Sequence, residues 1–488
     1  MANKNQEPFK LPSHKTKIIC TIGPACSSLY KLEEMINSGM NVARLNLSHG
    51  EFKVHAQNIR NIRKAAAKCR RMVSILMDLP GVKMRLGTLQ DGGVMLKKGA
   101  DIILTTQHML GTDKKIPVEY KDLPRAVTAG SIIFLNDGFI QLKVERILRQ
   151  DIFCKVIVGG KLLSHKGINL PGAQLNINPI TKRDLEIVEF GLSQGVHVFG
   201  LSFVEKSEDV LKVREFARRK GHPVYLVAKI ERSSAVENFD ELIKAADAVM
   251  VARGDLGVET PIEEVPGIQK RLIHKANLMG RPVITATQML ESMTQNVRPT
   301  RAEVNDVANA ILDGTDAIML SQETAIGDYP VETVRMMAKI AIATENQRDG
   351  GSLSTNEGVR ISDKVSEGGL LSITDVVSLN AVRAAWQLDA RYILTPTTSG
   401  STARRISRFK PPCWILSFSA NLRVCNFLNF SYGVHPFILN KSISHDPKVI
   451  FRKLNQAHLT AKSDTVILIE RRLSPHPGDT DSLGIVTL

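Results

Sequence analysis

The amino-acid sequence predicts an α/β protein: a (β/α)8 TIM barrel with a small β-barrel lid domain inserted into it and a further α/β domain after it. Three observations predict this fold. Eight short apolar runs are each followed by polar residues and an amphipathic segment, one stretch alternates with period two, and the sequence changes character near residue 347. Eight strand–helix units are the number that closes such a barrel, and an open doubly wound sheet is the alternative fold.

Each apolar run has the length and content of a buried parallel strand. Helix signals lie between the runs. Thr300 precedes Glu303 by three residues, which is the pattern of a capping box, and Thr181 opens another helix. Pro330 suits the first turn of a helix over 330–345. The eight runs are 17–23, 41–47, 73–78, 196–202, 224–229, 248–253, 282–287 and 316–321.

Residues 87–170 differ from the barrel units, because apolar and polar residues alternate there and glycines separate the runs. Alternation with period two predicts antiparallel strands with one buried face. We therefore expect a barrel of residues 1–86 and 171–346, with a lid domain of 87–170 inserted at its catalytic rim. A closing lid excludes water from a site, and a passive insertion is the alternative.

The C-terminal part, 347–488, begins with a polar and glycine-rich stretch that is typical of a linker. A helix is expected over 373–388, followed by strands near 391–395, 413–418 and 464–470. This pattern predicts a separate α/β domain.

The composition excludes several classes of protein. No apolar run reaches the roughly 18–20 residues that span a membrane, and the N-terminal residues lack the apolar core of a secretory signal. The six cysteines are scattered without a CxxC pair, so we expect reduced thiols in a cytoplasmic protein. The net charge of +15 indicates a basic solvated surface, which also suits anionic substrates, and no motif for specific nucleic-acid binding accompanies it.

Polar side chains follow the apolar runs at the carboxyl ends of the strands, where barrels of this kind have their active sites. Lys229 and Glu231 are two residues apart on one strand and therefore share a face. With Asp255 on the next strand, they provide two carboxylates that suit Mg²⁺ or Mn²⁺. A structural salt bridge to Lys229 is the alternative. The strand-end set is Arg44, Asn46, Ser48, Asp78, Ser202, Lys229, Glu231, Arg253, Asp255, Thr287, Ser321 and Glu323.

Three further features suit phosphoryl transfer, which depends on positioning and on neutralising charge. RGDLG at 253–257 is expected to open a turn before a helix, where backbone N–H groups bind a carboxylate or phosphate; an ordinary tight turn is the alternative. Arg44 carries a planar cation that binds phosphate through two hydrogen bonds. Thr287 adds a hydroxyl, or is simply a packed strand residue.

At these positions the sequence strongly resembles the pyruvate kinase family. The resemblance runs in order over nearly the whole predicted barrel and weakens after residue 350. It implies an enzyme that transfers the phosphoryl group of phosphoenolpyruvate to ADP, giving pyruvate and ATP. The matching stretches are KTKIICTIGPAC at 15–26, ARLNLSHG at 43–50, KGINLPG at 166–172, VAKIE at 227–231, VMVARGDLGVE at 249–259, VITATQMLESM at 283–293 and RPTRAEVNDVANAILDGTDAIMLSQETAIGDYP at 298–330.

The resemblance also implies roles for the residues at matching positions. Glu231 and Asp255 resemble the protein ligands of the catalytic divalent metal. Lys229 resembles the cation that stabilises the transferring phosphoryl group and the enolate, and Arg44 resembles the arginine on the substrate phosphate. The other implied roles are a substrate carboxylate site of Gly254, Asp255 and Thr287, a proton relay of Thr287, Ser321 and Glu323, and nucleotide-side or lid contacts of His49, Arg85, Asp137 and Lys166.

A monovalent-cation site is implied in the same way. Asn46, Ser48, Asp78 and the Leu79 carbonyl match it, but Lys83 stands where potassium-dependent members of the family carry glutamate. We therefore expect a built-in ammonium to replace K⁺, so that activity does not require potassium. A solvent-facing lysine without a role is the alternative.

The C-terminal part contains TPTTSGSTARR at 395–405, in which small hydroxyl residues surround a glycine. Such a loop suits a phosphate group, and the family binds phosphorylated allosteric effectors at a similar loop. A helix start capped by serine or threonine is the alternative. The resemblance further implies a homotetramer. The candidate effector residues are Thr397, Thr398, Ser399, Ser401 and Thr402.

Three other functions compete with this interpretation. A metal-dependent aldolase or lyase acting on pyruvate enolate shares the metal and enolate chemistry, so ADP-dependent formation of pyruvate separates the two. A non-catalytic regulator would keep the fold, but the intact Lys229, Glu231 and Asp255 argue against it. For an RNA-binding protein the sequence offers only its positive charge.

Overall fold

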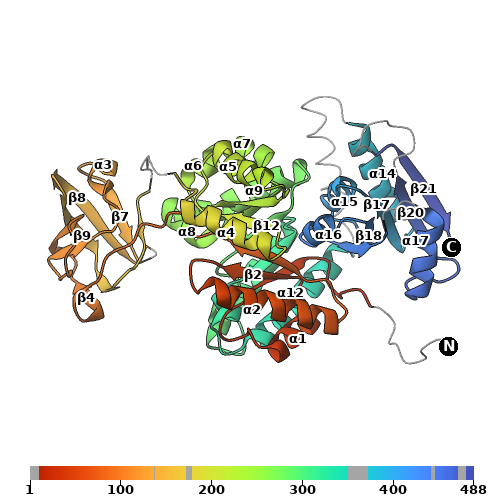
Figure 1. Ribbon diagram of the computed structural model, residues 1–488, viewed down its shortest axis with the longest axis horizontal. Coiled ribbons are helices and arrows are strands. Elements are labelled where there is room, and N and C mark those ends of the chain that lie inside the picture. Colours follow the sequence, from red (N-terminus) through yellow and green to blue (C-terminus); the bar gives the residue numbers. More distant parts are fainter. Residues whose placement is uncertain (1–9, 137, 172–177, 350–371, 441–445, 471–479) are drawn as a thin grey trace.

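The structure is a computed structural model that describes residues 10–136, 138–171, 178–349, 372–440, 446–470 and 480–488. Three bodies lie in a row along the long axis of the molecule (Figure 1). A parallel barrel is in the middle, a β domain lies at one end, and an α/β domain lies at the other. None of the helices in these ranges is long and apolar enough to cross a membrane.

The central body is a closed barrel of parallel strands, so the predicted (β/α)8 fold is confirmed. Each predicted apolar run coincides with one strand, although β13 extends one residue beyond its run, and the strands neighbour one another in the order β1-β16-β15-β14-β13-β12-β3-β2. Their residues are buried almost throughout, because helices cover the outside and side chains fill the interior. The strands are β1 Lys17–Thr21, β2 Val42–Asn46, β3 Ser74–Asp78, β12 Val198–Leu201, β13 Tyr225–Ile230, β14 Ala248–Ala252, β15 Val283–Ala286 and β16 Ala317–Leu320.

The helices around the barrel begin where the sequence signals predict. Thr300 and Glu303 form the expected capping box at the start of α10, with Glu303 N donating to Thr300 Oγ1 at 3.2 Å. Thr181 caps α4 in the same way, with Asp184 as its partner. The barrel helices are α1 Leu29–Ser38, α2 Phe52–Lys68, α4 Lys182–Ser193, α5 Ser207–Arg219, α6 Ser233–Glu237, α7 Phe239–Ala245, α8 Arg253–Glu259, α9 Val265–Leu278, α10 Arg301–Leu312, α11 Gln322–Ala325 and α12 Pro330–Asp349.

The inserted segment folds into a six-stranded sheet in the order β11-β7-β8-β9-β5-β6 and a two-stranded sheet of β10 and β4. All its strand pairs are antiparallel except β5 with β6. Alternate residues point inward into a separate apolar core, as the period-two pattern predicts. Its elements are β4 Gly93–Leu96, β5 Asp101–Thr105, β6 Lys115–Pro117, α3 Leu123–Ala126, β7 Ile132–Leu135, β8 Ile140–Leu148, β9 Asp151–Val158, β10 Gly160–Leu163 and β11 Ile168–Asn169.

The C-terminal domain has a five-stranded sheet in the order β19-β18-β17-β20-β21, in which only the edge strand β21 is antiparallel. The helix and the three strands predicted here are present. The strands β19 and β21 were not predicted. The elements are α14 Ile373–Gln387, β17 Tyr392–Pro396, α15 Ser401–Ser407, β18 Trp414–Ser419, α16 Leu422–Leu428, β19 Val434–Ile438, α17 Pro447–Gln456, β20 Thr465–Glu470 and β21 Ser482–Thr487.

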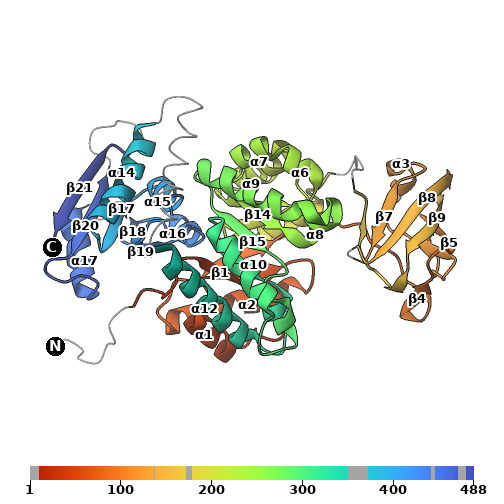
Figure 2. The same ribbon diagram turned by 180° about the vertical axis from the view of Figure 1, so that it is seen from behind.

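The amino ends of the barrel strands face the C-terminal domain. Lys17, which begins β1, donates from Nζ to the Val434 carbonyl at 2.7 Å. Lys410 pairs with Asp316, which precedes β16, at 2.8 Å. The carboxyl ends of the strands therefore face the inserted β domain, and the view from behind shows the same order of the three bodies (Figure 2).

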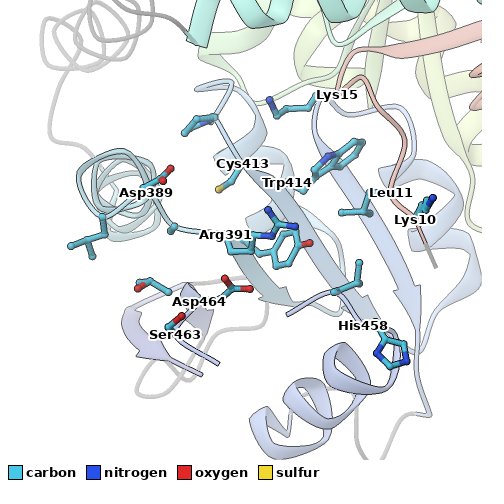
Figure 3. A pocket seen from close by; sticks show the side chains of 16 residues that line it. Lys10, Leu11, Lys15, Asp389, Arg391, Cys413, Trp414, His458, Ser463 and Asp464 are labelled. Atoms are coloured by element: carbon cyan, nitrogen blue, oxygen red, sulfur yellow. The ribbon is translucent and has the colours of Figure 1, made fainter. Parts of the chain in front are cut away.

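A pocket of about 970 Å³ lies between the N-terminal segment and the amino ends of β17, β18 and β20 (Figure 3). It is lined by Lys10, Leu11, Arg391, Trp414 and Asp464, among others, and by none of the predicted site residues. Because it is at the C-terminal domain and away from the barrel mouth, it is separate from the site described next.

Candidate active site

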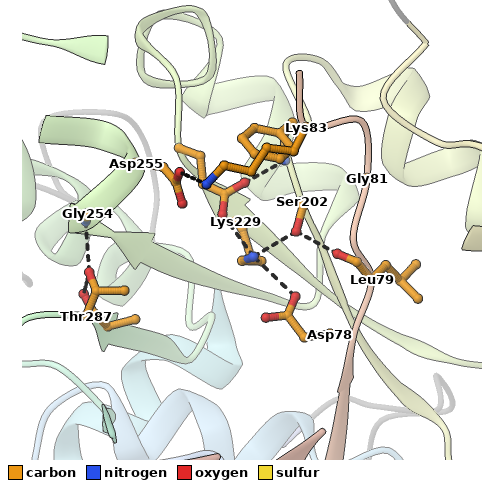
Figure 4. Close-up of polar contacts among 12 residues, drawn as sticks. Asp78, Leu79, Gly81, Lys83, Ser202, Lys229, Gly254, Asp255 and Thr287 are labelled. Atoms are coloured by element: carbon orange, nitrogen blue, oxygen red, sulfur yellow. Dashed lines mark hydrogen bonds and ion pairs between the residues drawn. The ribbon is translucent and has the colours of Figure 1, made fainter. Parts of the chain in front are cut away.

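Lys229, near the end of β13, is the centre of a buried charge cluster at the barrel mouth (Figure 4). Its Nζ lies 2.9 Å from Glu231 Oε1 and 3.2 Å from Asp78 Oδ1, and it donates to Ser202 Oγ at 2.7 Å. Burial alone would lower the pKa of this lysine, but the charges of Asp78 and Glu231 outweigh burial and raise the pKa. The ammonium therefore stays charged at neutral pH.

Asp78, the last residue of β3, links Lys229 to Arg44 on β2. Arg44 reaches Asp78 Oδ2 through two nitrogens, Nε at 2.8 Å and Nη2 at 2.6 Å. Burial raises the pKa of the Asp78 carboxyl, but the charges of Lys229 and Arg44 more than offset burial and lower it. Two cations are thus held side by side at the mouth by one ionised carboxylate.

Glu231 is almost fully buried, and its Oε2 accepts a hydrogen bond from Phe203 N at 2.7 Å. Burial raises the pKa of its carboxyl, Lys229 opposes this, and the nearby negative charge of Asp255 adds to it. A cation shared by two carboxylates that repel each other stabilises the charged form of both. This pair therefore fits a divalent metal.

The donor set at this pair narrows the choice of metal. In the described part of the chain, no group of three or more His, Cys, Asp or Glu residues is arranged to hold an ion. Mg²⁺ is usually bound by one or two carboxylates, with water and substrate oxygens completing its shell. Glu231 and Asp255 match that requirement, without nitrogen or sulfur ligands.

The RGDLG motif is not a turn that precedes a helix, as predicted, because α8 begins at Arg253 itself. Gly254 N donates to Thr287 Oγ1 at 2.8 Å, and that hydroxyl donates to the Ala286 carbonyl at 2.6 Å. Thr287 has a φ of +67°, in the left-handed region that favours glycine. The structure therefore places Thr287 against the start of α8.

Ser321 and Glu323 lie together after β16. Ser321 N donates to Glu323 Oε2 at 2.6 Å, and Leu290 N donates to Oε1 at 3.4 Å. Burial raises the pKa of the Glu323 carboxyl. A carboxyl group with a raised pKa holds its proton at a higher pH than an exposed one, which favours a role in proton transfer.

This geometry agrees with what comparison with known proteins shows. The family model "Pyruvate kinase, barrel domain" matches residues 13–334, and "Pyruvate kinase, alpha/beta domain" matches residues 375–486. The chain belongs to the pyruvate kinase family.

The similarity to individual relatives covers most of the chain. The chain is 51% identical over 464 residues to a pyruvate kinase of Thermococcus litoralis, covering 95% of this chain and 96% of the relative. It is 44% identical over 424 residues to a pyruvate kinase of Geobacillus stearothermophilus, covering 86% of this chain and 71% of that one. The crystal structure of a pyruvate kinase from Cryptosporidium parvum is similar, with a TM-score of 0.89, 35% identity, and coverage of 97% of this chain and 96% of that chain.

The residues that resemble the monovalent-cation site of pyruvate kinases make local contacts. Asn46 Oδ1 accepts a hydrogen bond from Ser48 N at 3.1 Å. The Leu79 carbonyl accepts one from Ser202 Oγ at 2.6 Å. Lys83 Nζ lies 3.1 Å from Asp255 Oδ1, so it contacts one of the two carboxylates proposed for the divalent metal.

Two of the residues expected on the nucleotide side, Arg85 and Lys166, lie where the barrel meets the inserted domain. Arg85 Nη1 donates to the His165 carbonyl at 3.1 Å, and the Lys166 carbonyl accepts from Leu86 N at 2.9 Å. His49 is exposed. Asp137 lies outside the described residues.

The candidate effector loop forms the start of α15. The Thr397 hydroxyl accepts from Gly400 N at 2.9 Å, and the Ser399 hydroxyl accepts from Ser401 N at 3.3 Å. Thr402 Oγ1 lies 2.7 Å from Thr480 Oγ1, and Thr398 is exposed. The Thr397 and Ser399 hydroxyl groups thus bond backbone N–H groups at the start of α15, but its N-cap residue, Gly400, makes no side-chain capping bond, so the capping alternative is not what the structure shows.

Two of the polar residues at the strand ends, Ser202 and Arg253, had no predicted role of their own. Ser202 connects the Lys229 ammonium to the Leu79 carbonyl. Arg253 turns away from the mouth and contacts the loop after β15. The signal available in the sequence was only their position at the end of a strand.

Proposed function

We propose that this chain catalyses the transfer of the phosphoryl group of phosphoenolpyruvate to ADP, giving pyruvate and ATP, the last step of glycolysis. The observation that carries this proposal is the contact of Lys229 with both Asp78 and Glu231 at the barrel mouth. Phosphoryl transfer depends on cations that are already in place where negative charge migrates.

Two cations of the chain are available to the phosphoryl group. Arg44 is held by Asp78 through two nitrogens, which leaves its guanidinium fixed in direction. The Lys229 ammonium lies on the other side of the same carboxylate. In the proposed reaction, Arg44 binds the substrate phosphate. Lys229 stabilises the phosphoryl group during its transfer and the enolate that remains after the transfer.

Glu231 and Asp255 would hold Mg²⁺ or Mn²⁺. When bound there, the ion would neutralise negative charge on the phosphoryl and enolate oxygens. Lys83, paired with Asp255, supplies a further fixed positive charge. We propose that this ammonium makes K⁺ unnecessary at the site of Asn46, Ser48, Asp78 and Leu79.

The substrate carboxylate is proposed to lie against the start of α8, at Gly254, Asp255 and the Thr287 hydroxyl. Thr287, Ser321 and Glu323 are proposed to deliver a proton to the enolate carbon, which converts the enolate to pyruvate. The raised pKa of Glu323 supports this role, because burial makes this carboxyl group bind a proton more readily than an exposed one. Formation of the stable keto product drives the transfer toward ATP.

The inserted β domain is proposed to act as a lid over the nucleotide, with His49, Arg85, Asp137 and Lys166 on the nucleotide side. Its position at the carboxyl ends of the barrel strands supports this, because closure there excludes water from the reaction.

We further propose a phosphorylated effector at Thr397, Thr398, Ser399, Ser401 and Thr402, a homotetrameric assembly and a cytoplasmic location.

A coupled assay tests the proposed function directly. Pyruvate formation from phosphoenolpyruvate is measured with and without ADP, and with Mg²⁺ present or omitted, in potassium-free buffer. We expect pyruvate only when both ADP and Mg²⁺ are present. Pyruvate formed without ADP would favour the aldolase or lyase alternative, and no turnover under any condition would favour the non-catalytic regulator.

A further inference from the structure

The guanidinium of Arg253 is buried and holds three successive carbonyl groups of one loop. Arg253 is the first residue of α8, and its side chain is 8% exposed. Nη2 donates to the Thr287 carbonyl at 2.6 Å and to the Gln288 carbonyl at 3.2 Å, and Nε donates to the Ala286 carbonyl at 3.3 Å. Its charge is balanced by Asp306 Oδ1 at 2.8 Å.

The loop held in this way has an unfavourable backbone. Thr287 and Gln288 have φ angles of +67° and +53°, although both carry a Cβ atom. Such conformations persist only where the surrounding structure maintains them. The Arg253 contacts fall on the carbonyl groups of these two residues and of Ala286 before them, so one side chain fixes the whole turn.

The same turn positions the Thr287 hydroxyl. Its Oγ1 accepts from Gly254 N at 2.8 Å and donates to the Ala286 carbonyl at 2.6 Å. Arg253 and Gly254 are consecutive residues of α8, so the backbone of the helix start holds the hydroxyl while the neighbouring side chain holds the backbone beneath it.

We propose that Arg253 is a positioning residue for the reaction: through the Ala286–Gln288 turn, it fixes the Thr287 hydroxyl where the substrate carboxylate binds. Arg253 itself does not touch substrate. The inference rests on the proposed function, because it assigns Thr287 to the substrate site. The proposed role of Arg253 differs from a purely structural one, since Arg253 affects turnover only by positioning the Thr287 hydroxyl group.

The chain offers a matched control for structural effects. Arg214 on α5 donates to the carbonyl groups of Val224 and Ala245 at 3.3 and 2.8 Å and pairs with Asp247 at 2.9 Å. It therefore makes the same kinds of contact as Arg253, but at the amino ends of the barrel strands. R214M should lower stability and leave kcat within a few-fold of the wild type.

The test is a double-mutant cycle on kcat, with thermal unfolding measured in parallel. We expect R253M to lower kcat by about 100-fold, the scale of a misplacement of about 1 Å in a site. In a T287A background, R253M should lower kcat further by no more than about 3-fold, because residues that act as a unit are not additive. R253K keeps the charge beside Asp306 but loses the forked donors, so it should fold and still lose at least about 10-fold in kcat.

Two outcomes overturn the inference while leaving the proposed function intact. In the first, the wild-type enzyme forms pyruvate, and the R253M and R253K variants retain its kcat. The other is an R253M loss that is equally large with and without Thr287, which would show that Arg253 does not act through the hydroxyl. A wild-type protein that forms no pyruvate would instead overturn the proposed function.

Discussion

Lys83 and Asp255 form an ion pair across the barrel mouth, with Lys83 Nζ lying 3.1 Å from Asp255 Oδ1. Lys83 follows β3, whereas Asp255 belongs to α8, and the two are 172 residues apart in the chain. A fixed ammonium therefore already lies beside the carboxylates proposed to bind the divalent metal.

This pair predicts independence from potassium. Turnover of the wild type should be unchanged when KCl is exchanged for tetramethylammonium chloride. Lys83→Glu should lower turnover in potassium-free buffer and regain activity with added K⁺, because two facing carboxylates require a cation between them. Lys83→Met removes the charge without adding a carboxylate and is the control. A steep loss of wild-type turnover on removing K⁺ would contradict the prediction.

Glu231→Gln should weaken binding of Mn²⁺ by at least about 10-fold, since even indirect partners of metal ligands contribute 10–100-fold to affinity. The measurement is titration of the protein with Mn²⁺, followed by electron paramagnetic resonance and without substrate. Glu205→Gln is the matched control, because Glu205 pairs with Arg232 near the barrel mouth and is not a proposed ligand. Equal Mn²⁺ affinity in the Glu231→Gln variant and the wild type would exclude Glu231 as a ligand.

Lys229→Met should abolish turnover and lower the free energy of unfolding by about 3–5 kcal/mol, because Asp78 and Glu231 lose their shared cation. The pKa of Lys229 is raised, so the stabilisation is fully present below the unfolded pKa of about 10.4 and is lost as pH rises through the folded pKa. The difference between wild type and variant should thus be constant from about pH 6 to 9. Lys212→Met, which removes a lysine bonded to the Ile180 carbonyl, is the control. A difference that shrinks already between about pH 6 and 9 would contradict the prediction.

The contribution of Lys17 to folding stability should depend on pH in the opposite direction. Burial lowers its pKa to about 7, against the opposing charges of Glu345 and Asp316. Between about pH 7 and 10 the unfolded chain binds this proton and the folded chain does not, so stability should rise with pH. Lys17→Met should remove that rise, as measured by urea unfolding at several pH values. Lys53→Met, at an exposed position of α2, should keep it. A pH dependence that is the same in Lys17→Met and the wild type would rule out this assignment.

Much of the fold could be predicted because its signals are local. The barrel strands were visible as apolar runs, and Thr300 with Glu303 marked a helix start, since a capping box needs only residues three apart. The strands β19 and β21 were missed, because their sequences, VHPFI and SLGIVT, are interrupted by proline, histidine or glycine. Their pairing with the neighbouring strands β18 and β20 compensates for weak local preference.

The site divides in the same way. The sequence alone placed Lys229, Glu231 and Asp255 at the ends of neighbouring strands, because parallel strands of a barrel end on one rim. Only the tertiary structure decided that Asp78 lies between Lys229 and Arg44, that Ser202 connects Lys229 to the Leu79 carbonyl, and that Arg253 faces the Thr287 loop. These contacts join residues from different strand–helix units, so they exist only once the barrel has closed and its side chains have packed.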